Sequence, residues 1–277
     1  MNTHFTKTLL ATLLATLGAT AAQAASLSLV TGSVNGSLAV LASVNDQAIA
    51  VDAGIDDLSG TGFLLGAGGN DFNQALTPAG TLTQLWSAGA SLDTTLNPTS
   101  AVFQAGSMSV LGVDAAGRFD GSDDSTSVLL EAELAILSTG EAEGSAVRVD
   151  VSGVADSLFA STGPSVQALP SFDLVVRDAG SQILGSWQGL PAGGSDSFSF
   201  SFQSQIGQVL SFSLSHYSSL MADGLALGAG ARHTLDASAL LDGQISVSAV
   251  PEPETYALFL AGLAGIGLLQ RRSRSAR

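Results

Sequence analysis

Serine and histidine are the first residue types in this sequence that could do catalytic chemistry. A serine nucleophile needs a histidine base, and after residue 24 the chain contains only His216 and His233. No Gly-x-Ser-x-Gly nucleophile elbow occurs, since Gly185-Ser186-Trp187-Gln188-Gly189 places its serine one position too early. Either histidine could act as a general base, but a solvated or hydrogen-bonded structural histidine is the simpler interpretation.

Clustered carboxylates suggest a second chemistry, the binding of a divalent cation. Asp120, Asp123 and Asp124 lie within five residues, in a segment whose Gly121 and Ser122 favour a turn. Carboxylate oxygens are the ligands that calcium prefers, although the segment lacks the spacing and the distal glutamate of an EF-hand. The sequence therefore allows a calcium site at these three aspartates, with a solvated acidic turn as the alternative. No other cofactor is expected.

Two further pairs of residues keep carbohydrate chemistry open. Glu131 and Glu133 would point to the same face of a strand and could form the carboxylate pair of a glycoside hydrolase, although an exposed polar face is the simpler interpretation. Trp86 and Trp187 could stack on sugar rings, but tryptophan in a β-sandwich more often lies in the core.

The elements that would position these side chains are β-strands. Apolar residues alternate with serine or charged residues, which places the apolar ones on a single face of each strand. Examples are Leu27 and Leu29; Val147, Val149 and Val151; Leu174 and Val176; and Phe198, Phe200 and Phe202. Many short strands without helical crossovers predict an all-β fold, a β-sandwich of jelly-roll type.

Some segments allow more specific predictions. We expect an antiparallel hairpin over residues 197–215, with the apolar side chains of both arms on one face. Residues 127–137 fit a strand better than a helix, and residues 218–227 also compete as a helix. Two further strands are expected, at 232–235 and 244–247. The glycine-rich stretch 54–69 is a long loop or a boundary between subdomains.

Composition limits the possible partners. The chain has 277 residues, of which 45% are hydrophobic, enough for one sizeable core. Between residues 25 and 250, four arginines stand against 22 acidic residues, a formal charge of −18. We therefore expect no nucleic-acid partner and no affinity for anionic lipid. Cysteine is absent, so the core must be held by packing, and thiol catalysis is excluded.

The N-terminus has the layout of a secretory signal peptide. Lys7 precedes an apolar run over residues 9–22, and Ala22-Gln23-Ala24 forms a small-x-small cleavage site. We expect signal peptidase to cleave after Ala24 and to remove residues 1–24.

The C-terminus carries a second membrane-directed segment. Val250-Pro251-Glu252-Pro253-Glu254 precedes an apolar stretch over residues 256–269, which is followed by Arg271, Arg272, Arg274 and Arg277. As a helix the stretch would extend about 21 Å, against a hydrocarbon core of about 30 Å, so it would be a marginal transmembrane span. The arginines would stop transfer and stay in the cytoplasm, which agrees with an exported N-terminal region.

The proline segment has its own physical role. Pro251 and Pro253 fix their φ angles, lack amide donors and push Val250 and Glu252 toward extended conformations. The segment therefore cannot join a helix, and it forms a rigid, extended stretch that a processing enzyme can reach.

In this order, Pro251-Glu252-Pro253, a short apolar helix and an arginine cluster resemble the PEP-CTERM sorting segment, and residues 251–260, PEPETYALFL, resemble a common variant of it. The family often has Ser or Thr where Glu254 stands. The resemblance implies recognition by an exosortase, a membrane-embedded cysteine transpeptidase-like enzyme of Gram-negative bacteria that make exopolysaccharide. Such segments also carry an ice-binding label, but no regular Thr-x-Thr array supports ice binding here.

Together these patterns predict a signal peptide at 1–24, a secreted β-sandwich domain at 25–249 and a sorting segment at 250–277. We expect transient anchoring in the inner membrane with the C-terminus in the cytoplasm, then location at the cell surface or in an extracellular biofilm matrix. The expected function is that of a non-enzymatic surface or exopolysaccharide-matrix protein. A calcium-assisted carbohydrate-binding module and a secreted polysaccharide-active enzyme are the alternatives.

Overall fold

The computed structural model describes residues 25–60, 62–76, 80–115, 117–161, 166–189, 193–227, 232–250 and 261–264. These ranges cover most of the β-domain expected at 25–249. The expected signal peptide with Ala22 and Ala24, the motif residues Pro251, Glu252 and Pro253, and the arginines Arg271, Arg272 and Arg274 lie outside the described residues.

Alternating apolar and polar side chains produce long strands. The strands are β1 (Ala25–Val44), β2 (Gln47–Gly54), β3 (Asp56–Gly60), β4 (Phe63–Leu76), β5 (Gly80–Asn97), β6 (Ser100–Ala115), β7 (Gly117–Ser138), β8 (Ala146–Ser161), β9 (Val166–Arg177), β10 (Ile183–Gly189), β11 (Ser195–Gln205), β12 (Val209–Leu227) and β13 (Arg232–Ala249).

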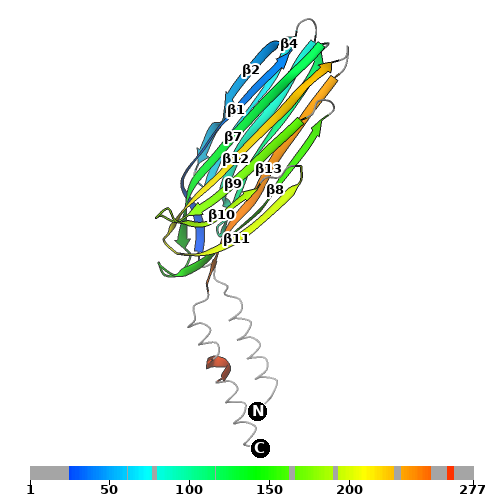
Figure 1. The fold of residues 1–277 in the computed structure, drawn as a ribbon. Helices are drawn as coiled ribbons and strands as arrows, with labels where there is room; N and C mark the ends of the chain where they lie inside the picture. Colours follow the sequence, from blue (N-terminus) through cyan, green and yellow to red (C-terminus); the bar gives the residue numbers. More distant parts are fainter. Residues whose placement is uncertain are drawn as a thin grey trace, which may run out of the picture.

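The strands form two antiparallel sheets that pack face to face (Figure 1). The six-stranded sheet has the order β10-β9-β12-β7-β1-β2, and the seven-stranded sheet has the order β11-β8-β13-β6-β5-β4-β3. Because each sheet has one apolar face, packing those faces together buries both. The all-β sandwich predicted from the alternation is confirmed.

The last eight strands, β6 to β13, are divided between the two sheets in a jelly-roll order. They form two four-stranded groups, β6-β13-β8-β11 in one sheet and β7-β12-β9-β10 in the other. The chain changes sheet at each step from β6 to β9 and again from β10 to β13, which is the strand order of two Greek keys combined in a jelly roll. Strands β1 and β2 widen one sheet, and β3, β4 and β5 widen the other.

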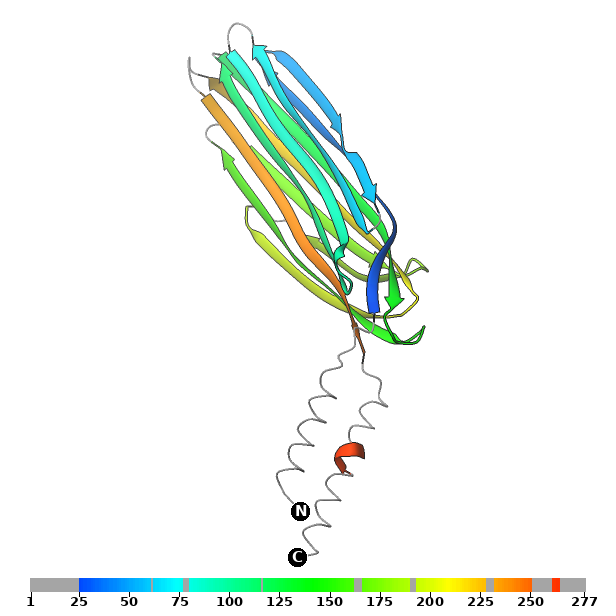
Figure 2. The ribbon, with the colours of Figure 1, turned by 180° about the vertical axis from the view of Figure 1, so that it is seen from behind.

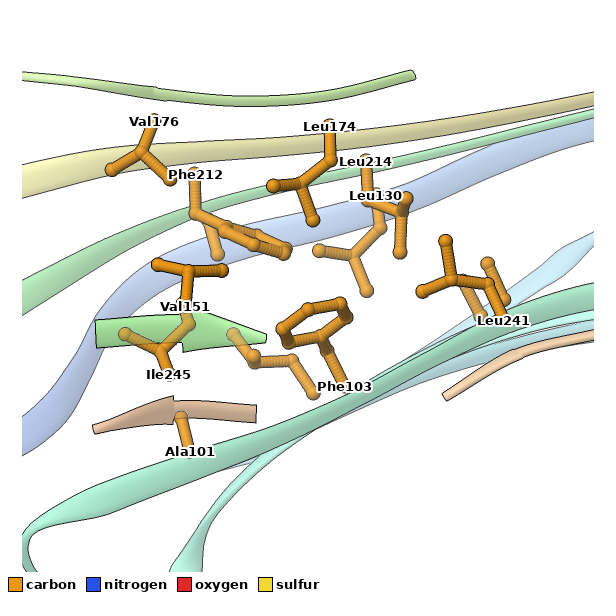
Figure 3. Close-up of a cluster of buried hydrophobic side chains, with 14 of the residues drawn as sticks. Ala101, Phe103, Leu130, Val151, Leu174, Val176, Phe212, Leu214, Leu241 and Ile245 are labelled. Carbon is orange, nitrogen blue, oxygen red and sulfur yellow. The ribbon is translucent and has the colours of Figure 1, made fainter. Parts of the chain in front are cut away.

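The core lies between the sheets and is apolar along most of its length. In Figure 3, Phe103 and Leu241 of the seven-stranded sheet face Leu130 and Phe212 of the six-stranded sheet. The rings of Phe103 and Phe212 lie with their centroids 5.0 Å apart and their planes tilted by 53°. Because the two rings come from different sheets, this contact joins the sheets directly, and both rings are fully buried.

The expected hairpin over residues 197–215 is wrong in its pairing. β11 pairs with β8 in one sheet, whereas β12 pairs with β7 and β9 in the other, so the turn at 206–208 crosses the sandwich. The apolar residues of both strands do face the same core. Alternation reports which face of a strand is buried, but two strands facing one another across a core show the same pattern as two neighbours in one sheet.

Other local expectations also change. The glycine-rich stretch 54–69 contains β3 and the first half of β4, so it is neither a long loop nor a boundary. The strands expected at 232–235 and 244–247 are parts of a single strand, β13, which is central in its sheet. Residues 127–137 lie in β7 as predicted, and 218–227 lie in β12.

The start of β1 and the end of β13 lie side by side at one end of the sandwich, which we call the base (Figure 2). The amide of Leu27 donates to the carbonyl of Pro98 at 2.8 Å, and the amide of Val247 donates to the carbonyl of Thr99 at 2.9 Å. One turn therefore holds the first and the last strand together.

Gly243 is a position where the core requires glycine. A Cβ at this position in β13 would overlap the ring of Phe103, which is fully buried and packs against Phe212. We expect Gly243→Ala to lower the free energy of unfolding by about 1–3 kcal/mol, the usual cost of overpacking, measured by urea denaturation.

The matched control is Gly194→Ala, because a Cβ at Gly194 meets no atom of the described residues within 4 Å. It should change stability by less than about 0.5 kcal/mol. Shortening the ring in the double variant Gly243→Ala, Phe103→Leu should cost less than the sum of the single changes. Additive losses would contradict the proposed overlap.

Candidate functional site

The three aspartates considered for calcium lie on a strand and not on a turn. Residues 117–138 form β7, where successive side chains point to opposite faces. Asp123 is exposed on the outer face, and Asp124 is buried between the sheets. The expected turn is wrong, because the strand continues through Gly121 by pairing with both β1 and β12. The carboxylates do not converge, so the calcium site stays a prediction without a supporting geometry. Within the described residues, no three acidic or histidine side chains are grouped as a metal site.

Asp120 instead holds the turn between β1 and β2. Its Oδ2 accepts hydrogen bonds from Ser43 Oγ at 3.1 Å and from the amide of Asp46 at 3.0 Å. Asn45 and Asp46 have φ angles of 51° and 61°, the left-handed conformation of a two-residue hairpin turn. A carboxylate that accepts the turn's amide stabilises this conformation.

Asp124 is the most strongly perturbed acidic group among the described residues. Its side chain is only 5% exposed, and its Oδ2 accepts hydrogen bonds from Gln84 Nε2 at 3.1 Å and Ser109 Oγ at 3.2 Å. Burial raises the pKa of Asp124 to about 7, and the nearby charge of Asp123 adds to this, while the two hydrogen bonds oppose it. The carboxyl group is therefore largely protonated below neutral pH.

His216 is a hydrogen-bonded structural histidine, as expected. It is 1% exposed, its ring stacks on Phe172 with centroids 4.4 Å apart, and burial lowers its pKa to about 4. Nδ1 donates to the carbonyl of Ser171 at 3.1 Å, which leaves Nε2 of the neutral ring to accept from Ser107 Oγ at 2.8 Å.

The Ser107–His216 pair has the spacing of a nucleophile and its base. It lies between the sheets, however, where a substrate has no access to the ring. The side chain of His233, the other histidine considered, falls outside the described residues.

The two glutamates considered for hydrolysis lie on an outer face, and the two tryptophans considered for sugar binding point inward. Glu131 and Glu133 are both exposed on the outer face of the six-stranded sheet, as their spacing predicted. Trp86 is 3% exposed and belongs to the core. Trp187 is half-buried and stacks on Phe198 with centroids 4.4 Å apart. Neither indole is presented as a flat, open platform for a sugar ring.

Sequence reasoning missed Gln84, Ser107 and Ser109. All three point inward, on strands whose other inward residues are apolar, such as Ala88 and Leu111. The available signal was a polar residue on the apolar face of an alternating strand. Serine is so frequent in this chain that the break in the pattern at positions 107 and 109 does not stand out.

The outer face of the seven-stranded sheet has a shallow groove of about 500 Å³. Its floor is formed by Gly89 and Gly106, which lie opposite one another on β5 and β6. A side chain at Gly106 would overlap the carbonyl of Ala239, so the floor stays bare. Leu65, Ser91, Gln104, Met108 and Leu240 are among the residues that surround it.

At the base, β13 leads directly into the C-terminal segment. β13 ends at Ala249, and the amide of Val250 donates to the carbonyl of Ala146 at 3.2 Å. A helical turn is described at 261–264, with all four residues exposed. Within the described part of the chain, no helix has the length and apolar character needed to cross a membrane.

The fold and this segment define a β-sandwich protein with an appended C-terminal signal. Residues 249–274 match the family model of the PEP-CTERM protein-sorting motif. The chain therefore carries a PEP-CTERM sorting domain, as the resemblance of residues 251–260 predicted, and the match implies export and processing by an exosortase.

Other comparisons add little. No curated protein sequence matches the chain. The structure of TmCBM61 in complex with β-1,4-galactotriose is similar at 12% identity over 51% of this chain and 71% of that one, with a TM-score of 0.23. The N-terminal cellulose-binding domain of β-1,4-glucanase C from Cellulomonas fimi is similar at 11% identity over 58% and 84%, with a TM-score of 0.19. At these TM-scores the similarities carry no argument about fold or function.

Asp124 and His216 give opposite contributions to the pH dependence of stability. The folded-state pKa of Asp124 is raised from 3.8 to about 7, so its contribution is lost as pH rises through that interval. The folded-state pKa of His216 is lowered from 6.5 to about 4, so its contribution is lost as pH falls through that interval. Between pH 4 and 6.5 the two slopes, each about 1.4 kcal/mol per pH unit, cancel. We expect the free energy of unfolding from these two groups to be flat there.

Single substitutions separate the contributions of Asp124 and His216 to the pH dependence of the free energy of unfolding. Asp124→Asn should make stability rise by about 3 kcal/mol from pH 4 to 6.5, and His216→Gln should make it fall by about the same amount. Urea denaturation at half-unit pH steps measures both. Asp242→Asn is the control, since Asp242 also accepts a hydrogen bond from a glutamine, Gln104, but is exposed. Variants that remain as flat as the wild type would refute the cancellation.

Proposed function

We propose that this chain is an exported, non-enzymatic protein of the cell surface or exopolysaccharide matrix, delivered there by exosortase processing of residues 250–277. The observation that carries the proposal is the PEP-CTERM match at residues 249–274, which begins at the last residue of β13. A signal peptide at 1–24, cleaved after Ala24 by signal peptidase, starts the route. The apolar segment 256–269 then anchors the chain in the inner membrane, with Arg271, Arg272 and Arg274 in the cytoplasm.

The geometry of the base supports this route. β1 begins and β13 ends at the base, so the expected signal peptide and the sorting segment are both attached to this end of the sandwich. Five residues, 251–255, separate Val250 from the apolar segment, and they span at most about 18 Å when extended. Before processing, the base therefore lies close to the membrane, within reach of a membrane-embedded enzyme.

The attachment of the segment to the fold is rigid. β13 is hydrogen-bonded on both sides, to β6 and to β8, and Val250 extends its pairing by one bond to Ala146. The prolines that follow cannot continue the strand, since they lack amide donors. The sorting motif thus follows directly in the sequence after Val250, the last residue for which a sheet-type hydrogen bond is described.

The non-enzymatic role is supported by the placement of the polar groups. The Ser107–His216 pair is enclosed between the sheets, and Glu131 and Glu133 lie on the outer face of the six-stranded sheet, opposite Ser213 and Ser211 of the neighbouring β12. The acidic, serine-rich exterior favours solubility and disfavours binding to anionic surfaces.

Glu252 provides a direct test of the sorting motif. We expect Glu252→Ala to abolish or strongly reduce C-terminal processing in the native host, because it removes the central residue of the motif. The full-length precursor should then accumulate in the membrane fraction. Mass spectrometry of the C-terminus and fractionation measure the effect.

Glu254→Ala is the matched control, with the same side chain removed two residues away at a position where the family pattern varies. It should be processed as the wild type is. Deletion of the exosortase gene should reproduce the Glu252→Ala result. Normal processing in that deletion strain would contradict the proposed route.

A second candidate function is glycan binding at the groove on the seven-stranded sheet. The bare floor of Gly89 and Gly106 admits an extended polymer chain close to the backbone, while Gln104 and Ser91 supply hydrogen bonds. The described lining residues include no carboxylate, so this binding would not need calcium.

Filling the groove tests this candidate. Ser91→Trp should abolish binding to the host's own exopolysaccharide, because the indole would occupy the space above the glycine floor. Ser127→Trp, on the outer face of the opposite sheet, is the control and should bind normally. Co-sedimentation with the polysaccharide measures both. Equal binding by the two variants would exclude the groove as the glycan site.

A further inference from the structure

A group of polar side chains, which we call the polar layer, interrupts the apolar core in the half of the sandwich away from the base. Gln84 and Trp86 on β5 and Ser109 on β6 come from one sheet, and Ser122 and Asp124 on β7 come from the other. Gln84, Trp86, Ser122 and Asp124 are each 7% exposed or less. Toward the base, the inward residues become apolar at Ala88 on β5 and at Val128 and Leu130 on β7.

The hydrogen bonds of the polar layer are incomplete. Asp124 Oδ2 accepts from Gln84 Nε2 and Ser109 Oγ, which joins the two sheets. Among the described residues, four buried polar atoms of this layer lack a partner: Gln84 Oε1, Trp86 Nε1, Ser122 Oγ and Asp124 Oδ1. Each such atom costs about 1–3 kcal/mol when it stays unsatisfied, which is large compared with the stability of a domain.

The residues that carry the four atoms lie around the Gln84–Asp124 hydrogen bond, with Trp86 one inward position closer to the base and Ser122 one inward position farther from it. Gln84 and Trp86 are two residues apart on the inner face of β5, and Ser122 and Asp124 are two residues apart on the inner face of β7. The direct bond between Gln84 and Asp124 brings the two strands' pairs together across the core. Side chains two apart on one face lie about 7 Å apart, so small molecules placed among them can reach several of these atoms.

The chemistry of the four atoms identifies the ligand. Trp86 Nε1 can only donate a hydrogen bond and Gln84 Oε1 can only accept one, whereas Ser122 Oγ does both. A metal cation would satisfy the oxygens but would leave the indole N–H unpaired. Water accepts from the indole and donates to the oxygens, and it makes about three such bonds at buried sites.

We propose that the polar layer binds ordered water, which bridges Trp86 and Ser122 to Gln84 and Asp124 and completes the hydrogen bonding between the two sheets. The water is an integral part of the fold, because it satisfies groups that neither sheet can satisfy alone. It also explains how a tryptophan with a buried, unpaired indole N–H is tolerated next to a glutamine in an otherwise apolar core.

Trp86 is a convenient reporter, because the chain has only two tryptophans and Trp187→Phe assigns their indole signals. The experiment is a pair of water-selective NOE and ROE spectra on the 15N-labelled full chain in detergent micelles. We expect a cross-peak between water and Trp86 Nε1–H with the sign of a long-lived complex, although the side chain is 3% exposed. Absence of that cross-peak would overturn the proposal.

Two further measurements separate water from the other sources of such a signal. Ser122→Ala should keep the cross-peak, because Gln84 and Asp124 still hold the water; its loss would assign the signal to the serine hydroxyl and refute the proposal. Titration with sodium or calcium chloride should leave the Trp86 indole shift unchanged. A saturating shift would instead identify a cation in the polar layer and would equally refute water as the ligand.

Discussion

The rest of this structure depends on the requirement that alternate residues of every strand point into one space between two sheets. The long strands repeat this pattern, so the inner side chains meet as a core centred on contacts such as Phe103 with Phe212. The chain has no cysteine, so no disulfide supports the core, and burial of these apolar side chains favours the folded state. The same requirement places most of the serine and acidic residues on the outer faces of the sheets, Asp124 and Ser122 being buried exceptions.

The jelly-roll strand order decides where the two ends of the β-domain lie. Because β13 is inserted between β6 and β8, the last strand of the chain is among the best supported, with pairing along both edges. Its end lies beside the start of β1, and both strands bond to the Pro98–Thr99 turn. The sorting segment therefore follows a strand that is hydrogen-bonded along both edges.

Much of this could be read from the sequence, and the failures have physical causes. Alternation around Val149 and Phe200 correctly predicted strands and their buried faces, and Pro251-Glu252-Pro253 correctly predicted the sorting domain. Alternation cannot say which strand is the neighbour, so the hairpin at 197–215 was wrong. Turn-forming residue types at 121 and 122 were overridden, because pairing with β1 and β12 holds β7 extended. The contact of Gln84 with Asp124 was out of reach, since it joins residues 40 apart from different sheets.

The two ends of the core differ in composition, and this difference decides where a change of pH acts on the fold. Near the base, Phe103, Phe212 and Leu130 form an apolar contact that needs no proton or water to be complete. Farther from the base, burial favours the protonated carboxyl of Asp124 and the neutral ring of His216, so ionising either group destabilises the fold. Local opening is easiest where few apolar contacts are buried. A change of pH therefore acts first on the part of the core around Asp124, which lies away from the sorting segment. The Pro98–Thr99 turn, which is hydrogen-bonded to β1 and β13, and the hydrogen bond of Val250 lie at the other end of the sandwich, next to the sorting segment.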